Sequence, residues 1–72
     1  MKMNLIVKTD DGSVYESGFA EVGEDGLKEM QDFCERCHEF DYLKFSNNEK
    51  KETYYFPKEC ITRSVITLKL ED

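Results

Sequence analysis

One segment of helical periodicity, residues 25–40, constrains the fold of this chain most strongly, because the segments on both sides of it alternate like β-strands. At about 100° per residue, the apolar residues of this segment fall within one arc of about 140°, which predicts an amphipathic helix. A single helix of this kind has to bury its apolar stripe against the strands. The stripe consists of Leu27, Met30, Phe33, Cys34, Cys37 and Phe40.

The flanking segments alternate apolar and polar residues, as half-buried strands do. Before the helix, residues 3–9 and 13–22 form two such segments, and the Asp11-Gly12 pair between them is typical of a hairpin turn. Gly18 indicates a bulge in the second segment. We expect a polar turn at residues 47–51 and a short turn at residues 57–63. The three remaining strands are predicted at residues 41–46, 52–56 and 64–70.

This order, ββαβββ, predicts a single α+β domain over residues 1–72, with a curled, mainly antiparallel sheet and one amphipathic helix packed on it. Apolar residues occur on both faces of the strands, for example Leu5 beside Ile6 and Val65 beside Ile66. One helix covers one face only. We therefore expect the sheet to curl by pairing its first and last strands, or a second chain to cover it as in a homo-oligomer.

Residues 52–68, ETYYFPKECITRSVITL, resemble the closing strand, tight turn and final strand of the Sm-like small barrels. The resemblance implies a strongly curled sheet or small barrel in which Ile61 packs inward after the turn. The Gly and Asn residues characteristic of the Sm family are absent, and the helix lies in the middle of the chain rather than first. The resemblance therefore concerns the fold and implies no RNA binding.

The net charge of −6 lies entirely within residues 21–41, which contain eight acidic and two basic residues. The rest of the chain has eight of each, and these cancel. Such a field disfavours duplex nucleic acid and favours a protein partner with a basic surface. We expect that partner to bind the polar face of the helix, which carries Glu29, Asp32, Glu35, Arg36 and Glu39.

Apolar runs are short throughout the chain. The one near the start, Met3 to Val7, is too short for a signal peptide, and no run approaches the roughly 20 residues of a membrane span. The number of cysteines, three, is odd. These features predict a cytoplasmic protein with reduced thiols and no membrane association.

The Cys-x-x-Cys-His pattern at residues 34–38 has four interpretations. Covalent haem attachment normally takes place outside the cytoplasm, and a redox dithiol prefers the start of a helix rather than its acidic end. Zinc would have Cys34, His38 and Cys60 as candidate ligands, one fewer than a tetrahedral site requires. In the fourth interpretation, which we favour, the cysteines are small apolar residues of the helix stripe, and no cofactor is implied.

The sequence contains no catalytic motif, which predicts a protein that is not an enzyme. The alternative to a protein-binding module is an oligomeric binder of a small ligand such as a nucleotide, because basic and aromatic residues lie together in residues 50–55. Its site residues would be Lys50, Lys51, Tyr54 and Tyr55.

By general type, the chain resembles the small acidic accessory proteins of phages and prophages. That resemblance implies binding to a host protein, and inhibition of it, as the function.

Overall fold

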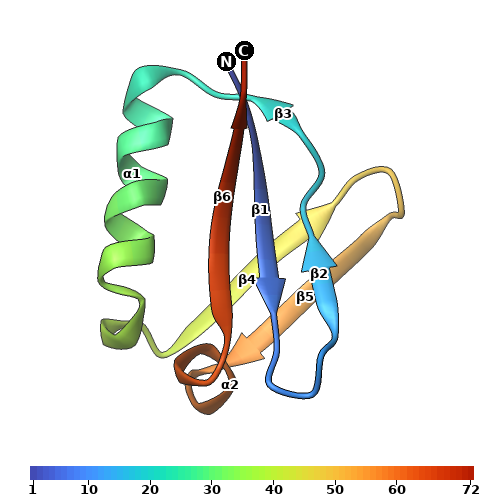
Figure 1. The fold of residues 1–72 in the computed structure, drawn as a ribbon, viewed down its shortest axis with the longest axis vertical. Coiled ribbons are helices and arrows are strands. Elements are labelled where there is room, and N and C mark those ends of the chain that lie inside the picture. Colours follow the sequence, from blue (N-terminus) through green and yellow to red (C-terminus); the bar gives the residue numbers. More distant parts are fainter.

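The first and last strands lie side by side at the centre of the fold (Figure 1). In this computed structural model, which describes residues 1–72, β1 (Lys2–Lys8) pairs antiparallel with β6 (Val65–Glu71) over all seven residues. The predicted pairing of the two terminal strands is therefore confirmed. On its other edge β1 pairs with β2 (Val14–Glu16) and β3 (Ala20–Glu21), which completes a four-stranded sheet.

The second predicted strand is interrupted. Gly18 adopts φ +82° between β2 and β3, a conformation that glycine accepts without steric cost, so the chain kinks and then rejoins the same edge of β1. The break falls at the glycine that indicated a bulge. Gly12, with φ +91°, lies in the turn between β1 and β2, where the Asp-Gly pair predicts one.

The hairpin of β4 (Tyr42–Asn47) and β5 (Glu52–Pro57) forms a separate two-stranded sheet that crosses the first sheet (Figure 1). The mixed α+β class and the mainly antiparallel strands are as predicted, but the strands do not close into a small barrel. Residues 57–63, predicted as a turn, contain the short helix α2 (Lys58–Thr62), and Ile61 is buried there as the resemblance implied.

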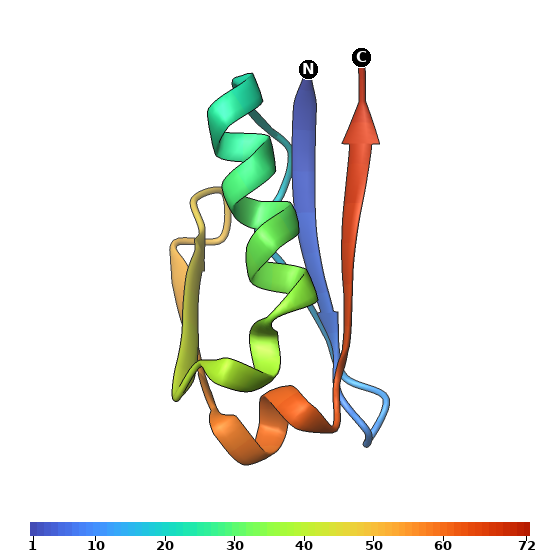
Figure 2. The ribbon, with the colours of Figure 1, turned by 90° about the vertical axis from the view of Figure 1, so that its left-hand side faces the viewer.

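The main helix, α1 (Glu24–Glu35), lies between the hairpin and the central strands when the molecule is seen from its side (Figure 2). The stripe from Leu27 to Cys34 faces inward and is half-buried, and no residue of α1 is fully buried. Neither helix is long and apolar enough to cross a membrane.

The helix is shorter than the predicted range of 25–40. It ends at Glu35 with Arg36 as its C-cap, and Cys37–Glu39 form one 3-10 turn, η1. The rings of Phe33 and Phe40 lie 4.9 Å apart. In a continuous helix these residues would be separated by about 10.5 Å along the axis, so their contact requires the break. The periodicity identified the inward-facing residues correctly and the end of the helix incorrectly.

The buried core is small and lies where the two sheets and α2 meet. Val7, Leu43, Phe56 and Ile61 form it, and half-buried aromatic residues surround them. Only seven residues are buried, and the chain exposes 5218 Å² of surface. A folded monomer of 8.5 kDa typically exposes about 4,650 Å². The chain thus buries less surface than its size allows.

Two buried amides hold the parts of the fold in register. Asn47 of β4 donates its Nδ2–H to the carbonyl oxygen of Glu16 at 2.9 Å and accepts the N–H of Lys50 at 3.1 Å. Asn4 donates to the Glu16 carboxylate at 3.0 Å and accepts the N–H of Gly18 at 3.0 Å. Asn47 therefore fastens the hairpin to the central sheet, and Asn4 fastens the kink between β2 and β3.

We predict that Asn47→Ala lowers the free energy of unfolding by about 1–3 kcal/mol, because it removes a buried amide and leaves the part-buried Glu16 carbonyl and Lys50 N–H without their partner. The neighbouring Asn48 is exposed, and Asn48→Ala should change that energy by less than about 0.5 kcal/mol. Urea denaturation of both variants measures the difference. Equal effects would show that the amide bridge does not fasten the hairpin.

Candidate functional site

The five residues predicted to bind a partner all lie on the exposed side of α1 and η1, and we call them the acidic face: Glu29, Asp32, Glu35, Arg36 and Glu39. Arg36 donates through Nη2 to Asp32 at 2.7 Å, and its Nε lies 3.6 Å from a Glu39 oxygen. All three side chains are more than half exposed, so these ion pairs contribute little to stability. Glu29 and Glu35 form no ion pair.

A hollow of about 500 Å³ adjoins the end of this face, and sequence analysis did not predict it. We call it the aromatic hollow. Its walls come from the inward side of α1, from η1 and from the start of β4. The residues lining it are Phe33, Glu39, Phe40, Asp41, Tyr42, Leu43 and Lys44.

The aromatic hollow combines ring faces with carboxylates. Phe33 and Phe40 pack together, and Tyr42 is 64% exposed at the opening. Asp41 forms no ion pair, so its charge is not neutralised within the chain. Alternation of acid and aromatic residues in Glu39-Phe40-Asp41-Tyr42 is the sequence signal that would have identified this hollow.

Such a lining suits a cationic group. Aromatic faces attract cations through the ring quadrupole, and carboxylates add charge-assisted hydrogen bonds. The one cation of the lining, Lys44, has its ammonium 5.6 Å from the ring centroid of Tyr55 on the outer side of the hairpin. It therefore has an aromatic partner of its own.

A second hollow, of about 380 Å³, runs beside β5 and contains Tyr54 and Tyr55 of the nucleotide hypothesis. Tyr54 faces inward, with its ring 5.1 Å from that of Tyr15, whereas Tyr55 is 68% exposed on the other side, as strand alternation predicts. Desolvation, followed by the hydrogen bond to Glu52, raises the pKa of Tyr54 above its ordinary value.

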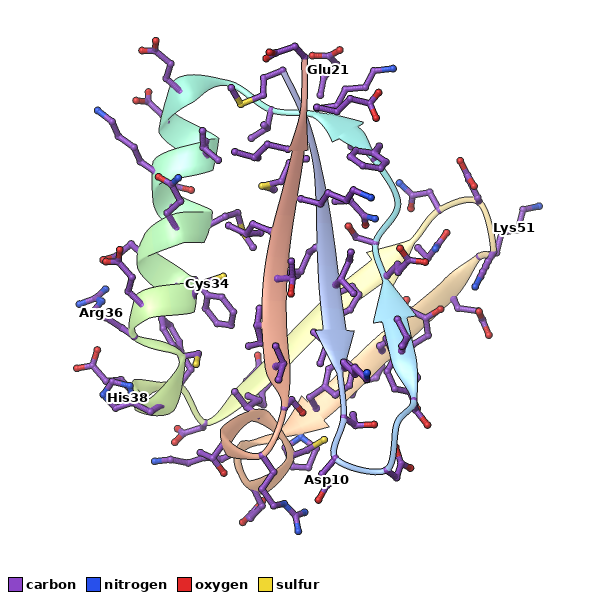
Figure 3. The ribbon with its side chains drawn as sticks, in the orientation of Figure 1. Asp10, Glu21, Cys34, Arg36, His38 and Lys51 are labelled. Carbon is purple, nitrogen blue, oxygen red and sulfur yellow. The ribbon has the colours of Figure 1, made fainter.

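The lysines of that hypothesis are not brought to this hollow. Lys50 and Lys51 belong to the turn between β4 and β5, where Figure 3 shows Lys51 at the tip of the hairpin. Neither lysine lines the hollow. The charged residue that does line it is Asp11, whose carboxylate disfavours a phosphate. The four predicted residues therefore do not form one site.

The cysteine pattern is divided between elements. Cys34 belongs to α1 and points toward the sheet, whereas His38 belongs to η1 and points away from it (Figure 3). Cys60, the third candidate zinc ligand, is in α2. No three histidine, cysteine, aspartate or glutamate side chains are close enough together to hold a metal ion. The structure thus does not assemble the predicted set of ligands.

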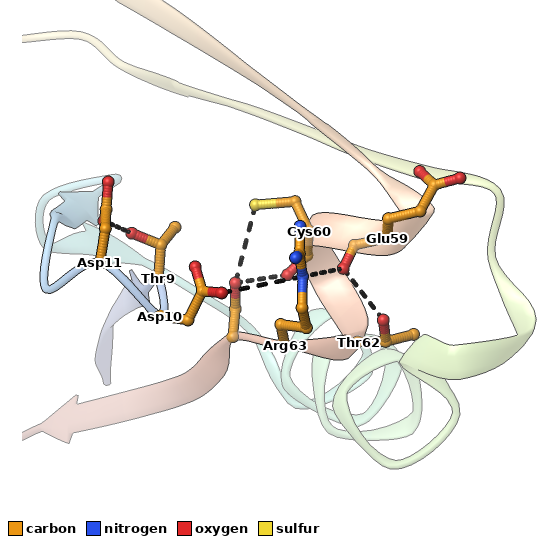
Figure 4. Close-up of polar contacts among 8 residues, drawn as sticks. Thr9, Asp10, Asp11, Glu59, Cys60, Thr62 and Arg63 are labelled. Carbon is orange, nitrogen blue, oxygen red and sulfur yellow. Dashed lines mark hydrogen bonds and ion pairs between the residues drawn. The ribbon is translucent and has the colours of Figure 1, made fainter.

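Cys60 takes part in a structural network around α2 (Figure 4). The hydroxyl of Ser64 donates to the Cys60 carbonyl at 2.6 Å and lies 3.8 Å from its sulfur. Arg63 donates to the carbonyl of Glu59 at 3.1 Å and pairs with Asp10 at 3.8 Å. These contacts join α2 to the turn after β1 and give Ser64 no base to activate it.

Burial is the main cause that raises the pKa of the Cys34 thiol, and the neighbouring Cys37 and Glu35 raise it further. A raised pKa means less thiolate at neutral pH, and the thiolate is the form that reacts. A protonated, half-buried thiol fits the apolar-stripe interpretation better than a redox function.

We predict that iodoacetamide modifies Cys34 of the folded chain at pH 7.5 more slowly than in urea, where all three cysteines should react alike. The rate for Cys34 should continue to rise above pH 9, because ionisation is shifted upward. Mass spectrometry of peptides after timed quenching gives the rate for each cysteine. Modification of Cys34 at the unfolded rate would contradict its burial.

Comparison with known proteins identified no relative: no family model, no curated protein and no solved structure matches this chain.

Proposed function

We propose that this chain is a non-enzymatic binding module that engages a basic protein surface through the acidic face and the aromatic hollow. The observation that supports this most strongly is the position of the hollow at the end of the acidic face, with Glu39 belonging to both. Unpaired carboxylates and exposed aromatic rings are thereby placed together on one side of the molecule. A partner would present arginine side chains to this surface.

Two physical effects contribute to binding, a long-range attraction and a contact inside the hollow. The charge concentrated in residues 21–41 attracts a basic partner at a distance, which increases the association rate and makes it depend on salt. The hollow supplies the anchor, because a guanidinium that enters it stacks on rings and meets carboxylates at the same time. Arginine fits better than lysine, since its planar group both stacks and forms two parallel hydrogen bonds.

The chemistry of this surface supports binding rather than catalysis. The acidic face and the hollow contain carboxylates, rings and two bases, with no serine or cysteine nucleophile beside a base. A partner whose basic surface normally holds nucleic acid would be blocked by competition. This is the mode of inhibition that the resemblance to phage accessory proteins implies.

We predict that E29K/E35K weakens binding of a fluorescent Arg-Gly repeat peptide at least tenfold, because it reverses the two unpaired charges of the face. The control E49K/E59K changes the net charge equally, from −6 to −2, at exposed positions away from the face. Fluorescence anisotropy at 50–500 mM NaCl measures both, and affinity should fall as salt rises. Equal losses for the two variants, or affinity independent of salt, would refute the acidic face as the site.

We predict that Tyr42→Ala weakens binding of the same peptide by about 0.5–2 kcal/mol, the value of a cation–π contact. Phe19→Ala is the control, because Phe19 is an exposed aromatic residue that lies outside the aromatic hollow. Tyr55→Ala, which also removes the aromatic partner of Lys44, is measured beside it. A peptide with neutral citrulline in place of arginine should bind neither the variants nor the original chain. If Tyr55→Ala has the larger effect, the ligand occupies the hollow beside β5 instead.

A further inference from the structure

The outer edge of β6 has no strand beside it, because β6 pairs only with β1. Leu5 of β1 donates its N–H to the Ser17 hydroxyl and accepts the N–H of Ser17, so its main-chain groups point toward β2 and β3. Main-chain groups alternate in direction along a strand, so the N–H and C=O groups of Asn4 and Ile6 point toward β6. The main-chain groups of their partners on β6, Lys69 and Thr67, point toward β1.

The free hydrogen-bonding groups of the β6 edge are therefore those of Ile66, Leu68 and Leu70. The side chains of these residues lie on the inner face of the sheet, since Val7, Leu5 and Met3 are their partners on β1. The edge thus presents regularly spaced donors and acceptors directly above an apolar face.

This edge lacks the features that normally protect an exposed strand. Its seven residues are regularly paired and contain neither proline nor glycine, with a single lysine, Lys69, near the end. By contrast β5 ends in Pro57, and β2 and β3 have three and two residues. Leu70 remains 44% exposed although it belongs to the inner face. The main-chain edge therefore lacks a partner, and Leu70 at its end is left largely uncovered.

We propose that β6 pairs antiparallel with β6 of a second copy of this chain, about a two-fold axis at Leu68. This register uses the whole strand and places Leu68 opposite itself and Ile66 opposite Leu70, so that all three free residues meet as hydrogen-bonded pairs. On the outer face Val65 lies opposite Glu71 of the partner subunit, and Thr67 lies opposite Lys69 of the partner subunit. No like charges are directly opposite each other.

The dimer joins two four-stranded sheets into one of eight strands and extends the inner apolar face. Because α1 lies on that inner side in each copy, the two-fold axis puts both helices on the same side of the joined sheet (Figure 2). Each chain has a net charge of −6, so the copies repel each other at long range. Added salt therefore strengthens this dimer, which is opposite to its effect on binding of a basic partner.

A charge placed at Val65 tests the register. Val65 is 64% exposed and faces Lys8 within the chain, so V65E gains an opposite charge in the monomer and meets Glu71 of the partner subunit in the dimer. The matched control is V14E, because Val14 is 55% exposed and faces the same Lys8 from β2, away from the edge. Like charges occur twice per dimer, so V65E should weaken dimerisation about 2- to 30-fold.

Sedimentation velocity at 50 and 500 mM NaCl, with the full chain at concentrations up to 1 mM, measures the dissociation constant. We expect a dimer that tightens with salt, weakens in V65E and is unchanged in V14E. Circular dichroism melts confirm that each variant is folded. A chain that stays monomeric at 500 mM NaCl overturns the proposal, as do equal effects of V65E and V14E.

Discussion

The pairing of β1 with β6 is the interaction on which the rest of the structure depends. It joins the two ends of the chain over seven residues and makes β1 the central strand, with β2 and β3 on its other side. The apolar residues Leu5 and Val7 then face inward, where α1 and the hairpin cover them. The same pairing leaves one edge of β6 open, so the interaction that completes the fold also creates an unpaired main-chain edge.

The position of the candidate site depends on how α1 packs in the fold and on where it ends. The helix contributes half-buried side chains to the interior and no fully buried one, so most of its surface, and nearly all of its charge, faces solvent. The break at Arg36 turns the chain back so that Phe40 contacts Phe33, and this turn opens the aromatic hollow beside the acidic face. A helix continuing to residue 40 would carry the charges without the hollow.

Periodicity predicted the features that depend on which way a side chain points. The inward residues of α1 and the opposite orientations of Tyr54 and Tyr55 agree with the structure. The buried position of Ile61 was implied by the Sm-like resemblance and not by periodicity. Periodicity did not predict features that depend on contacts between distant residues. The end of α1 is set by the packing of Phe33 against Phe40, and the separate hairpin is held by Asn47 bonding to Glu16. Proximity in the sequence likewise suggested one site made of Lys50, Lys51, Tyr54 and Tyr55. The hairpin instead separates the two lysines at its tip from the hollow that the two tyrosines line.

The central claim is that one surface, the acidic face together with the aromatic hollow, binds basic partners. Its most direct test is an NMR titration of the isotopically labelled chain with the Arg-Gly peptide, observed residue by residue. Saturable shifts confined to α1, η1 and the start of β4 are the expected result, with the largest at Phe40, Asp41 and Tyr42. Shifts centred on the hairpin tip or beside β5, or no saturable shift at low salt, would contradict the account.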